Sequence, residues 1–439
     1  MMTEQMKPSG IAWIGDIPAS WDVVRIKDIG TYRNGLTYAP EDVTEDDNGT
    51  LVLRSSNIQN GKISYDDKVY VKCSISTELM VKKGDIIICS RNGSRELIGK
   101  NAIVEDSGLT CSFGAFMMVY RCSCPRYIYY ILNSEVFSYY LGTFLTSTIN
   151  QLTGSNFGNM KIVFCTNCNE QRAIADYLDS QCAKIDSIAA DLKKQIELLQ
   201  KYKKSLITET VTKGLDKSVP MKDSGIEWIG EIPCTWNAKK IKYICNLVRG
   251  GSPRPIDNFL SNDDNDVNWI RIGDTEKGLK YINSTLLKVT NLGASRSRIV
   301  LPGTLLLTNS MSFGQPYILN ITGCIHDGWL AFSDYQNVEK EYLYYTLMAY
   351  YSIKQFEWAA IGAVVENLSV DKVGNSYIAV PPLNVQTQIV SFLDEKLRQI
   401  ENVIEMKQTQ LDQINGHKKS LIYEYVTGKK RVKEAAQWQ

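Results

Sequence analysis

Cysteine and histidine are the residue types that most often carry metal or nucleophilic chemistry, and both are sparsely arranged in this sequence. Cys165 and Cys168 form one C-x-x-C pair, whereas zinc sites usually combine two well-spaced pairs, or a pair with histidines. The two histidines are His326 and His417, which is too few for a histidine-based metal or acid-base site. We therefore expect no metal site, and we expect the eleven cysteines to be reduced thiols.

Known catalytic motifs are also absent from the sequence. It contains no G-x-x-x-x-G-K-[ST] phosphate loop, no H-E-x-x-H, no G-x-S-x-G turn and no glycine-rich cofactor loop. The run Val380-Pro381-Pro382-Leu383 superficially resembles an amino-methyltransferase motif, but it lacks the polar first residue and the aromatic that would hold a flipped base. We interpret it as prolines between a strand and a helix start, and we predict that the chain alone catalyses nothing.

Composition limits the remaining classes of protein. Apolar residues make up 44% of the chain and charged residues 22%, which is ordinary for a globular protein. The longest apolar runs, such as 86–88 and 305–307, are far shorter than a membrane span, and the first residues lack a signal-peptide core. We expect a soluble, cytoplasmic protein with no membrane partner. The net charge of +1 gives no sign of nucleic-acid binding, but a local basic patch or a basic partner subunit could still provide it.

An internal repeat is the most informative feature of the sequence. The block Met6–Trp21 recurs as Met221–Trp236 with eleven of sixteen residues identical, at an offset of 215. At the same offset, Lys203-Lys204-Ser205-Leu206-Ile207 recurs as 418–422. The segments between these blocks have diverged. The chain is therefore a tandem duplication that keeps a common frame around two different inserts.

Each half ends in a long helical pattern. Over 170–212, apolar residues recur at strict sevens, and others fill a second seam; the first set is Leu178, Ile185, Leu192, Leu199 and Leu206, and the second is Ile174, Ile188, Ile196 and Tyr202. Asn169 suits the N-cap and Gly214 the stop. The second half repeats the scheme from Asn384 to Gly428. Two such helices in one chain are expected to pack on each other.

The inserts have a different pattern. Short β-type runs lie at 50–53, 69–71, 86–88, 116–120 and 161–164, separated by turn signals. Each insert also holds a tyrosine-rich helical stretch, at 127–141 and at 341–356, whose tyrosines we interpret as core residues. The inserts are thus predicted to be compact α+β domains.

The repeated block, the helix start Asn169–Asp179 and the two Lys-Lys-Ser-Leu-Ile helix ends resemble the specificity subunit of type I restriction-modification enzymes over nearly the whole chain. The resemblance implies an α+β fold with two strand-rich α/β target-recognition domains, joined by two long helices that pair as an antiparallel coiled coil in an internal pseudo-twofold repeat. The first junction, 163–168, departs from the proline-rich pattern of Val380–Leu383.

The pattern divides the chain into six parts. These are the first repeated block (1–21), target-recognition domain 1 (22–165), spacer helix 1 (166–216), a linker with the second block (217–236), target-recognition domain 2 (237–383), and spacer helix 2 with a C-terminal tail (384–439).

The resemblance also implies the function and the partners. The chain would be a non-catalytic DNA-binding subunit, with each domain reading one half of an asymmetric bipartite site in double-stranded DNA. It would dock two modification subunits, which methylate adenine, and through them restriction subunits. No cofactor is expected on this chain; S-adenosylmethionine, ATP and magnesium are expected on the partners.

The duplicated frame supports this function independently. Two like modules with unlike surfaces can read two different short sequences, whereas identical modules would impose a palindrome. Two other classes stay open: a freestanding DNA-binding regulator, and a coiled-coil scaffold that binds no nucleic acid. The near-neutral net charge favours the scaffold, and the paired, diverged inserts argue against it.

Candidate base-reading residues lie on polar turns of the inserts, since arginine can pair with guanine and asparagine with adenine in the major groove. The first set is Arg33, Asn34, Arg54, Ser55, Asn57, Arg91, Asn92, Ser94 and Lys100. The second set is Arg249, Ser252, Arg254, Arg271, Asp274, Asn309, Ser310 and Ser312. Any one of them could instead be a solvated turn residue or part of an ion pair. The lysines at the helix ends are either partners of the helix dipole or contacts to modification subunits; they are Lys203, Lys204, Lys418 and Lys419.

Overall fold

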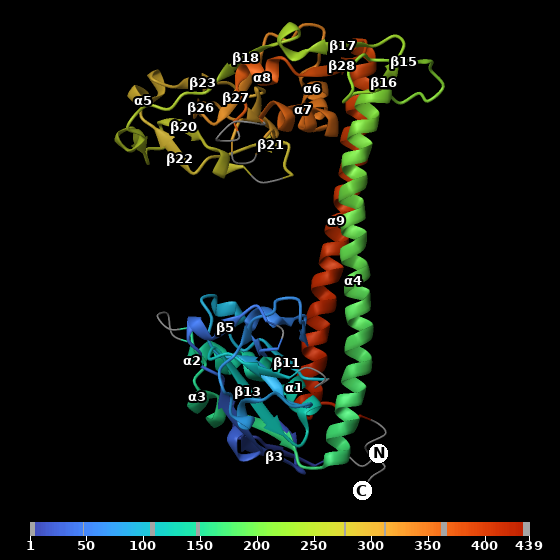
Figure 1. Cartoon of the computed structure of the whole chain (residues 1–439). Coiled ribbons are helices and arrows are strands. Elements are labelled where there is room, and N and C mark those ends of the chain that lie inside the picture. Colours follow the sequence, from blue (N-terminus) through green and yellow to red (C-terminus); the bar gives the residue numbers. More distant parts are fainter. Residues whose placement is uncertain are drawn as a thin grey trace. The chain divides into compact units, whose positions relative to one another are not determined.

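The computed structural model describes residues 5–46, 48–105, 110–145, 150–275, 278–310, 313–360 and 367–432. It divides into two compact units (Figure 1): unit 1 comprises Met1–Leu192 and Thr409–Gln439, and unit 2 comprises Lys193–Gln408. Two long helices, α4 (Cys168–Lys213) and α9 (Leu383–Val426), each contribute one part to each unit. No helix in these ranges is long and apolar enough to cross a membrane.

Unit 1 is built around two four-stranded sheets. The first has the order β11 (Asn101–Ile103), β10 (Ile86–Cys89), β13 (Met117–Cys122), β4 (Gly30–Asn34), and all its neighbours are antiparallel. The second has the order β12 (Cys111–Phe113), β6 (Thr50–Leu53), β9 (Tyr70–Val71), β5 (Val43–Thr44), and its β12–β6 pair is parallel. Three two-stranded pairs complete the unit: β1 (Met6–Pro8) with β2 (Asp16–Pro18), β3 (Trp21–Arg25) with β14 (Lys161–Cys165), and β7 (Ile58–Gln59) with β8 (Lys62–Ile63).

Unit 2 repeats this strand order. Its first sheet is β18 (Asn246–Arg249), β27 (Trp329–Ser333), β24 (Leu305–Thr308), β25 (Pro316–Leu319), with β21 (Tyr281–Ile282) added at the edge. The second is β19 (Leu260–Ser261), β22 (Leu287–Val289), β20 (Val267–Ile270), β26 (Gly323–Ile325), with β23 (Arg298–Val300) added. The pairs β15 (Met221–Asp223) with β16 (Glu231–Pro233) and β17 (Asn237–Lys240) with β28 (Tyr377–Val380) match those of unit 1. The duplication in the sequence is therefore a duplication of topology.

Burial explains why these runs form strands. The four side chains of β10, Ile-Ile-Ile-Cys, are all buried, as are Leu305, Leu306 and Leu307 of β24. Such central strands have apolar contacts on both faces, because one face packs on helices and the other on the second sheet. The predicted strand at 116–120 begins one residue later, because Phe116 precedes β13 and is 57% exposed.

The tyrosine-rich stretches are each two helices rather than one. In unit 1 they are α1 (Pro125–Leu132) and α2 (Glu135–Phe144), separated where the Ser134 side chain accepts a hydrogen bond from the N–H of Val136 and caps α2. In unit 2 they are α6 (Lys340–Met348) and α7 (Tyr350–Ala360). The remaining short helices are α3 (Gly154–Asn159), α5 (Asn291–Ser295) and α8 (Val370–Gly374). Tyr127 and Tyr342 are buried, which confirms the core interpretation for them.

The two long helices pair antiparallel within each unit. In unit 1, Ala189 and Leu192 of α4 pack with Leu411 of α9. In unit 2, Lys203 binds Glu401, and Gln195, earlier in α4, accepts from Lys407, later in α9. Gly214 and Gly428 follow the two helix ends with φ of 74° and 71°, a conformation that favours glycine and stops a helix. The predicted helices and their antiparallel coiled coil are confirmed.

Three details of the helix predictions were wrong. Asn167, not Asn169, caps α4, since its Oδ1 accepts from the backbone N–H groups of Asn169 and Glu170. Helix α9 begins at Leu383, one residue before Asn384. Ile188 and Tyr202 are 49% and 54% exposed and do not fill a second seam.

Candidate functional site

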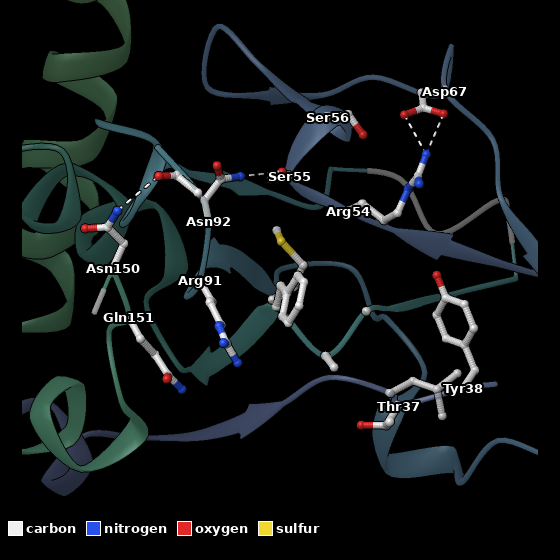
Figure 2. A pocket seen from close by; sticks show the side chains of 16 residues that line it. Thr37, Tyr38, Arg54, Ser55, Ser56, Asp67, Arg91, Asn92, Asn150 and Gln151 are labelled. Atoms are coloured by element: carbon white, nitrogen blue, oxygen red, sulfur yellow. Dashed lines mark hydrogen bonds and ion pairs between the residues drawn. The ribbon is translucent and has the colours of Figure 1, made fainter. Parts of the chain in front are cut away.

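Unit 1 has a hollow of about 1090 Å³ that brings four of the predicted residues together. Arg54 and Ser55 reach it from the end of β6, and Arg91 and Asn92 reach it from the end of β10 (Figure 2). The other lining residues are Leu36, Thr37, Tyr38, Ser56, Asp67, Gly93, Gly114, Ala115, Phe116, Met117, Asn150 and Gln151. Polar groups from five separate segments therefore surround an open cavity with an aromatic ring in its lining.

Hydrogen bonds hold the amide side chains of this hollow in place. Asn92 Nδ2 donates to Ser55 Oγ at 3.1 Å, and Asn150 Nδ2 donates to the carbonyl of Gly93 at 3.0 Å (Figure 2). The Asn92 Oδ1 accepts from the backbone N–H of Ser94 at 3.0 Å. These contacts tie the two predicted turns to each other, so that the side chains form one surface.

The two arginines of the hollow are fixed in different ways. Arg54 donates to both carboxylate oxygens of Asp67 at 2.7 Å, and its buried Nε has no hydrogen-bond partner among the described residues. A hydrogen bond from Ser56 and the charge of Arg54 lower the pKa of Asp67. Arg91 instead lies with its guanidinium carbon 5.2 Å from the centroid of the Phe116 ring, a cation-π distance. Arg91 thus has donors available to a ligand.

The other predicted residues of unit 1 lie away from the hollow. Arg33 forms an ion pair with Glu78 at 2.8 Å. Asn34 and Ser94 are exposed, and Lys100 is half-buried. None of the four lines the hollow.

Asn57 and Asp274 correct the predicted set, because both are buried structural caps. Asn57 is 1% exposed, and its Nδ2 donates to the carbonyls of Ser64 and Asp67. Its Oδ1 accepts from the N–H of Arg54, just as the Asp274 carboxylate accepts from the N–H of Arg271, at 2.8 and 2.9 Å. The side chain of Asp274 is 1% exposed. Neither side chain is available to a base in this structure.

In unit 2 the predicted residues gather around one carboxylate, that of Asp327. Ser252 Oγ donates to Asp327 Oδ1 at 2.7 Å, and Arg254 lies 3.6 Å from Oδ2. Arg249 Nε and Asn309 Nδ2 each donate to the backbone carbonyl of Asp327 at 2.8 Å. The hydrogen bond from Ser252 lowers the pKa of Asp327, with smaller contributions from the charges of His326 and Arg249. One anionic group thus organises two arginines, and the local charge stays positive.

Arg271 occupies in unit 2 the place of Arg54. Each arginine directly follows a strand, β20 or β6, and begins a short 3-10 helix (Ile272–Asp274 or Ser55–Asn57). The Arg271 guanidinium contacts Asp274 at 3.1 Å, and its buried Nε also has no partner within the described ranges. Ser310 is half-buried, and Ser312 lies outside the described residues.

Sequence reasoning missed Asp67, Phe116 and Asp327. The two acids stand ten or more residues from the arginines that they orient, so no local pattern indicates the pairing. Phe116 directly precedes an apolar run and reads as part of its strand. Only its neighbours Gly114 and Ala115 signal that the chain turns there.

The helix-end lysines are of two kinds. Lys418 contacts Asp186 and Lys203 contacts Glu401, each across the helix pair. Lys204 and Lys419 are exposed. Among the described residues no group of three or more histidine, cysteine or acidic side chains could hold a metal ion.

The comparisons with known proteins agree with this architecture. The family described as the type I restriction modification DNA specificity domain matches residues 18–198 and again residues 233–415. These matches cover most of the chain, one in each half, and the chain belongs to this family. The resemblance inferred from the repeated blocks is therefore confirmed.

Relatives match over the full length. The chain is 29% identical over 438 residues to a Methanocaldococcus jannaschii protein named "Putative type I restriction enzyme MjaX specificity subunit", with 96% of each chain covered. A solved chain from work on complex assembly of the type I R-M system matches with a TM-score of 0.73 at 15% identity, covering 94% of this chain and 99% of that one. The HsdS subunit from Thermoanaerobacter tengcongensis matches with a TM-score of 0.52 at 16% identity, covering 94% and 98%. At these identities, the two solved structures support the fold alone.

Proposed function

We propose that this chain is the DNA-binding specificity subunit of a type I restriction-modification complex, in which each unit reads one half of an asymmetric bipartite site. The observation that carries the proposal is a shared fold with unlike polar surfaces. Both units have the same strand order, yet unit 1 presents Arg54, Arg91 and Asn92 around a hollow, and unit 2 presents Arg249 and Arg254 around Asp327.

Direct readout of DNA requires side chains of this kind. Arginine binds the O6 and N7 of guanine through two N–H groups, and asparagine pairs with adenine. The arginines and asparagines lie at the ends of buried strands, and a rigid scaffold is what fixes such geometry. Two different sets of readers give two different half-sites, whereas two identical sets would give a palindrome.

The partners and cofactors follow from this function. Two modification subunits would bind the chain and carry S-adenosylmethionine for adenine methylation, and restriction subunits would join through them with ATP and magnesium. The exposed Lys204 and Lys419 are the helix-end lysines that remain available for such contacts. The near-neutral chain would gain affinity for DNA from basic surfaces of these partners.

The alternative functions fit less well. A scaffold without nucleic-acid binding gives no reason for arginine-rich, structurally equivalent surfaces on diverged inserts. A freestanding regulator would bind its site without modification subunits, which a binding measurement can test directly.

The deciding experiment is to express the chain with its modification subunits and to map methylated adenines across the genome. We expect one asymmetric bipartite motif. Exchanging residues 237–380 for the corresponding insert of another family member should alter one half of that motif and leave the other half and the spacer unchanged. Altered bases in both halves, or no bipartite motif, would contradict the proposal.

The isolated chain provides the matched control. It should transfer no methyl group in the presence of S-adenosylmethionine and should cleave no DNA in the presence of magnesium and ATP. Specific binding of the bipartite motif by the isolated chain, with full affinity and no effect of modification subunits, would favour the freestanding regulator instead.

A further inference from the structure

The same three-residue loop lies at the centre of both candidate surfaces. In unit 1 it is Gly114-Ala115-Phe116, between β12 and β13, and in unit 2 it is His326-Asp327-Gly328, between β26 and β27. The preceding strand pairs in parallel in both cases, β12 with β6 and β26 with β20. The two loops therefore occupy equivalent positions in the two copies of the fold.

Backbone hydrogen bonds establish the equivalence residue by residue. The N–H of Ser90 donates to the carbonyl of Phe116 at 2.9 Å, and that of Asn309 donates to the carbonyl of Gly328 at 2.9 Å. The carbonyls of Ser90 and Asn309 in turn accept from Leu152 and Leu368, at 2.7 and 2.8 Å. Each loop is thus clamped to the end of the central strand β10 or β24.

Close backbone contacts keep both loops in place. A Cβ at Gly35 would lie 2.1 Å from the carbonyl oxygen of Gly114, and a Cβ at Gly250 would lie 2.1 Å from that of His326. Only glycine permits this approach. The Phe116 carbonyl also accepts from the N–H of Arg91 at 3.1 Å and from Ser90 Oγ at 3.0 Å. The backbone is fixed in the same way in both units, and the side chains are what differ.

The side chains of the loops give the two units opposite chemistry. Unit 1 presents an apolar ring, Phe116, which is 57% exposed although the loop beneath it is rigid. The ring contacts Arg91 and lines the hollow with Asn92. Unit 2 presents a carboxylate, Asp327, which holds Ser252 and Arg254. An exposed aromatic on a fixed backbone is typical of a contact residue, because burying it on binding costs little conformational entropy.

We propose that this loop is the specificity-determining loop of each unit. In unit 1, Phe116 contacts the 5-methyl group of a thymine, next to a guanine that Arg91 binds through its N–H groups. In unit 2, Asp327 is a positioning residue that orients Arg249 and Arg254 toward the major groove. The assignment rests on the proposed function and on the rule that apolar side chains distinguish thymine by its methyl group.

The first test compares single variants in the complete complex with its modification subunits. Mapping of methylated adenines should show that Phe116→Ala relaxes one base position in one half-site only, and that Asp327→Asn relaxes the other half-site only. Asp327→Glu should restore part of the lost selectivity, since it keeps the charge. The matched controls are Tyr139→Ala, an aromatic 48% exposed and outside the hollow, and Asp264→Asn, an exposed acid of unit 2. Both controls should leave the motif unchanged.

The second test needs no variant of the wild-type complex. Each thymine of the half-site read by unit 1 is replaced by deoxyuridine, which lacks the methyl group, and binding to the oligonucleotide is measured. Loss of one buried methyl contact predicts about a fourfold weaker dissociation constant at one position. In the Phe116→Ala complex, thymine and deoxyuridine should bind equally at that position.

The outcomes separate the loop assignment from the proposed function. If the wild-type complex reads no bipartite motif, the proposed function fails. If it reads one, but no thymine of that half-site responds to deoxyuridine and Phe116→Ala keeps the motif intact, the loop assignment alone is overturned. A uniform loss of affinity for all sequences in the Phe116→Ala complex would overturn it as well, because a specificity residue must change the bases selected.

Discussion

Lys418 donates to both carboxylate oxygens of Asp186, at 2.6 and 2.7 Å, across the pair of long helices in unit 1. In unit 2, Lys203 makes the same contact with Glu401. Both members of each pair are offset by 215 residues, which is the period of the sequence repeat. The duplication has therefore kept an interaction together with its residues, although aspartate stands in one copy and glutamate in the other.

The first prediction concerns this pair of ion pairs. Lys418→Glu should destabilise unit 1 because it places two acids opposite each other, and the second change Asp186→Lys should restore stability. The side chains are 29% and 60% exposed, so the pair should contribute only about 0.2–1 kcal/mol. Chemical denaturation of the single and double variants measures this contribution. Lys419→Glu, on the exposed face, is the control, and a double variant no more stable than Lys418→Glu would contradict the prediction.

A second prediction concerns a tyrosine hydroxyl that joins α1 to α4. Tyr130 donates to Asp179 Oδ1 at 2.5 Å, and Tyr345 makes the equivalent contact with Asp394, again at the offset of 215. Burial and the nearby Asp179 carboxylate raise the pKa of Tyr130, which keeps its hydroxyl protonated as a donor. Since Asp179 remains half-exposed to water, Tyr130→Phe should cost about 1–2 kcal/mol of unfolding free energy. Tyr139→Phe, at an exposed ring, should cost nothing measurable in the same urea titration.

The frame of the fold could be predicted from the sequence because it depends on local periodicity. The expected helix at 170–212 is observed as Cys168–Lys213, since heptad spacing, a cap and a terminal glycine are all local signals. The tyrosine stretches were predicted less well, because Ser134 breaks the helix by capping the next one. A single polar residue in an apolar helical pattern does not show in advance whether it will face solvent or cap.

The candidate site could be predicted only as a set of turns. Arg54, Ser55 and Asn57 lie on one short segment, yet Ser55 lines the hollow and Asn57 is buried. The difference arises because the Asn57 amide binds carbonyls that stand seven and ten residues away. Asp327 gave no signal at all, since the arginine that it shares with Ser252 comes from more than seventy residues earlier in the chain. Contacts of this kind depend on tertiary structure.

A third prediction uses the chain's two histidines. Burial lowers the pKa of His326, which lies in the loop beside Asp327. The unfolded chain therefore binds a proton at this residue before the folded chain does, and stability is lost as pH falls through the ordinary histidine value of about 6.5. Melting temperatures across this pH range should show a smaller acid loss for His326→Gln than for the wild type. His417→Gln, on an exposed position of α9, should follow the wild-type curve, and identical curves for all three proteins would contradict the assignment.

The last prediction concerns the distance between half-sites. Helices α4 and α9 each run from one unit into the other, and the units divide after Leu192 in α4 and after Gln408 in α9. Inserting one heptad at both positions keeps the apolar face in register and adds roughly 10.5 Å to each helix. Because one base pair occupies about 3.4 Å, the spacer of the recognised motif should lengthen by about three base pairs, while the bases of each half stay the same. Mapping of methylated adenines in cells that carry the doubly inserted chain measures both quantities at once. A heptad inserted in α4 alone is the control and should abolish methylation, since it displaces α4 against α9. If the double insertion instead changed the half-site bases and left the spacer as it was, the helices would not set the spacing.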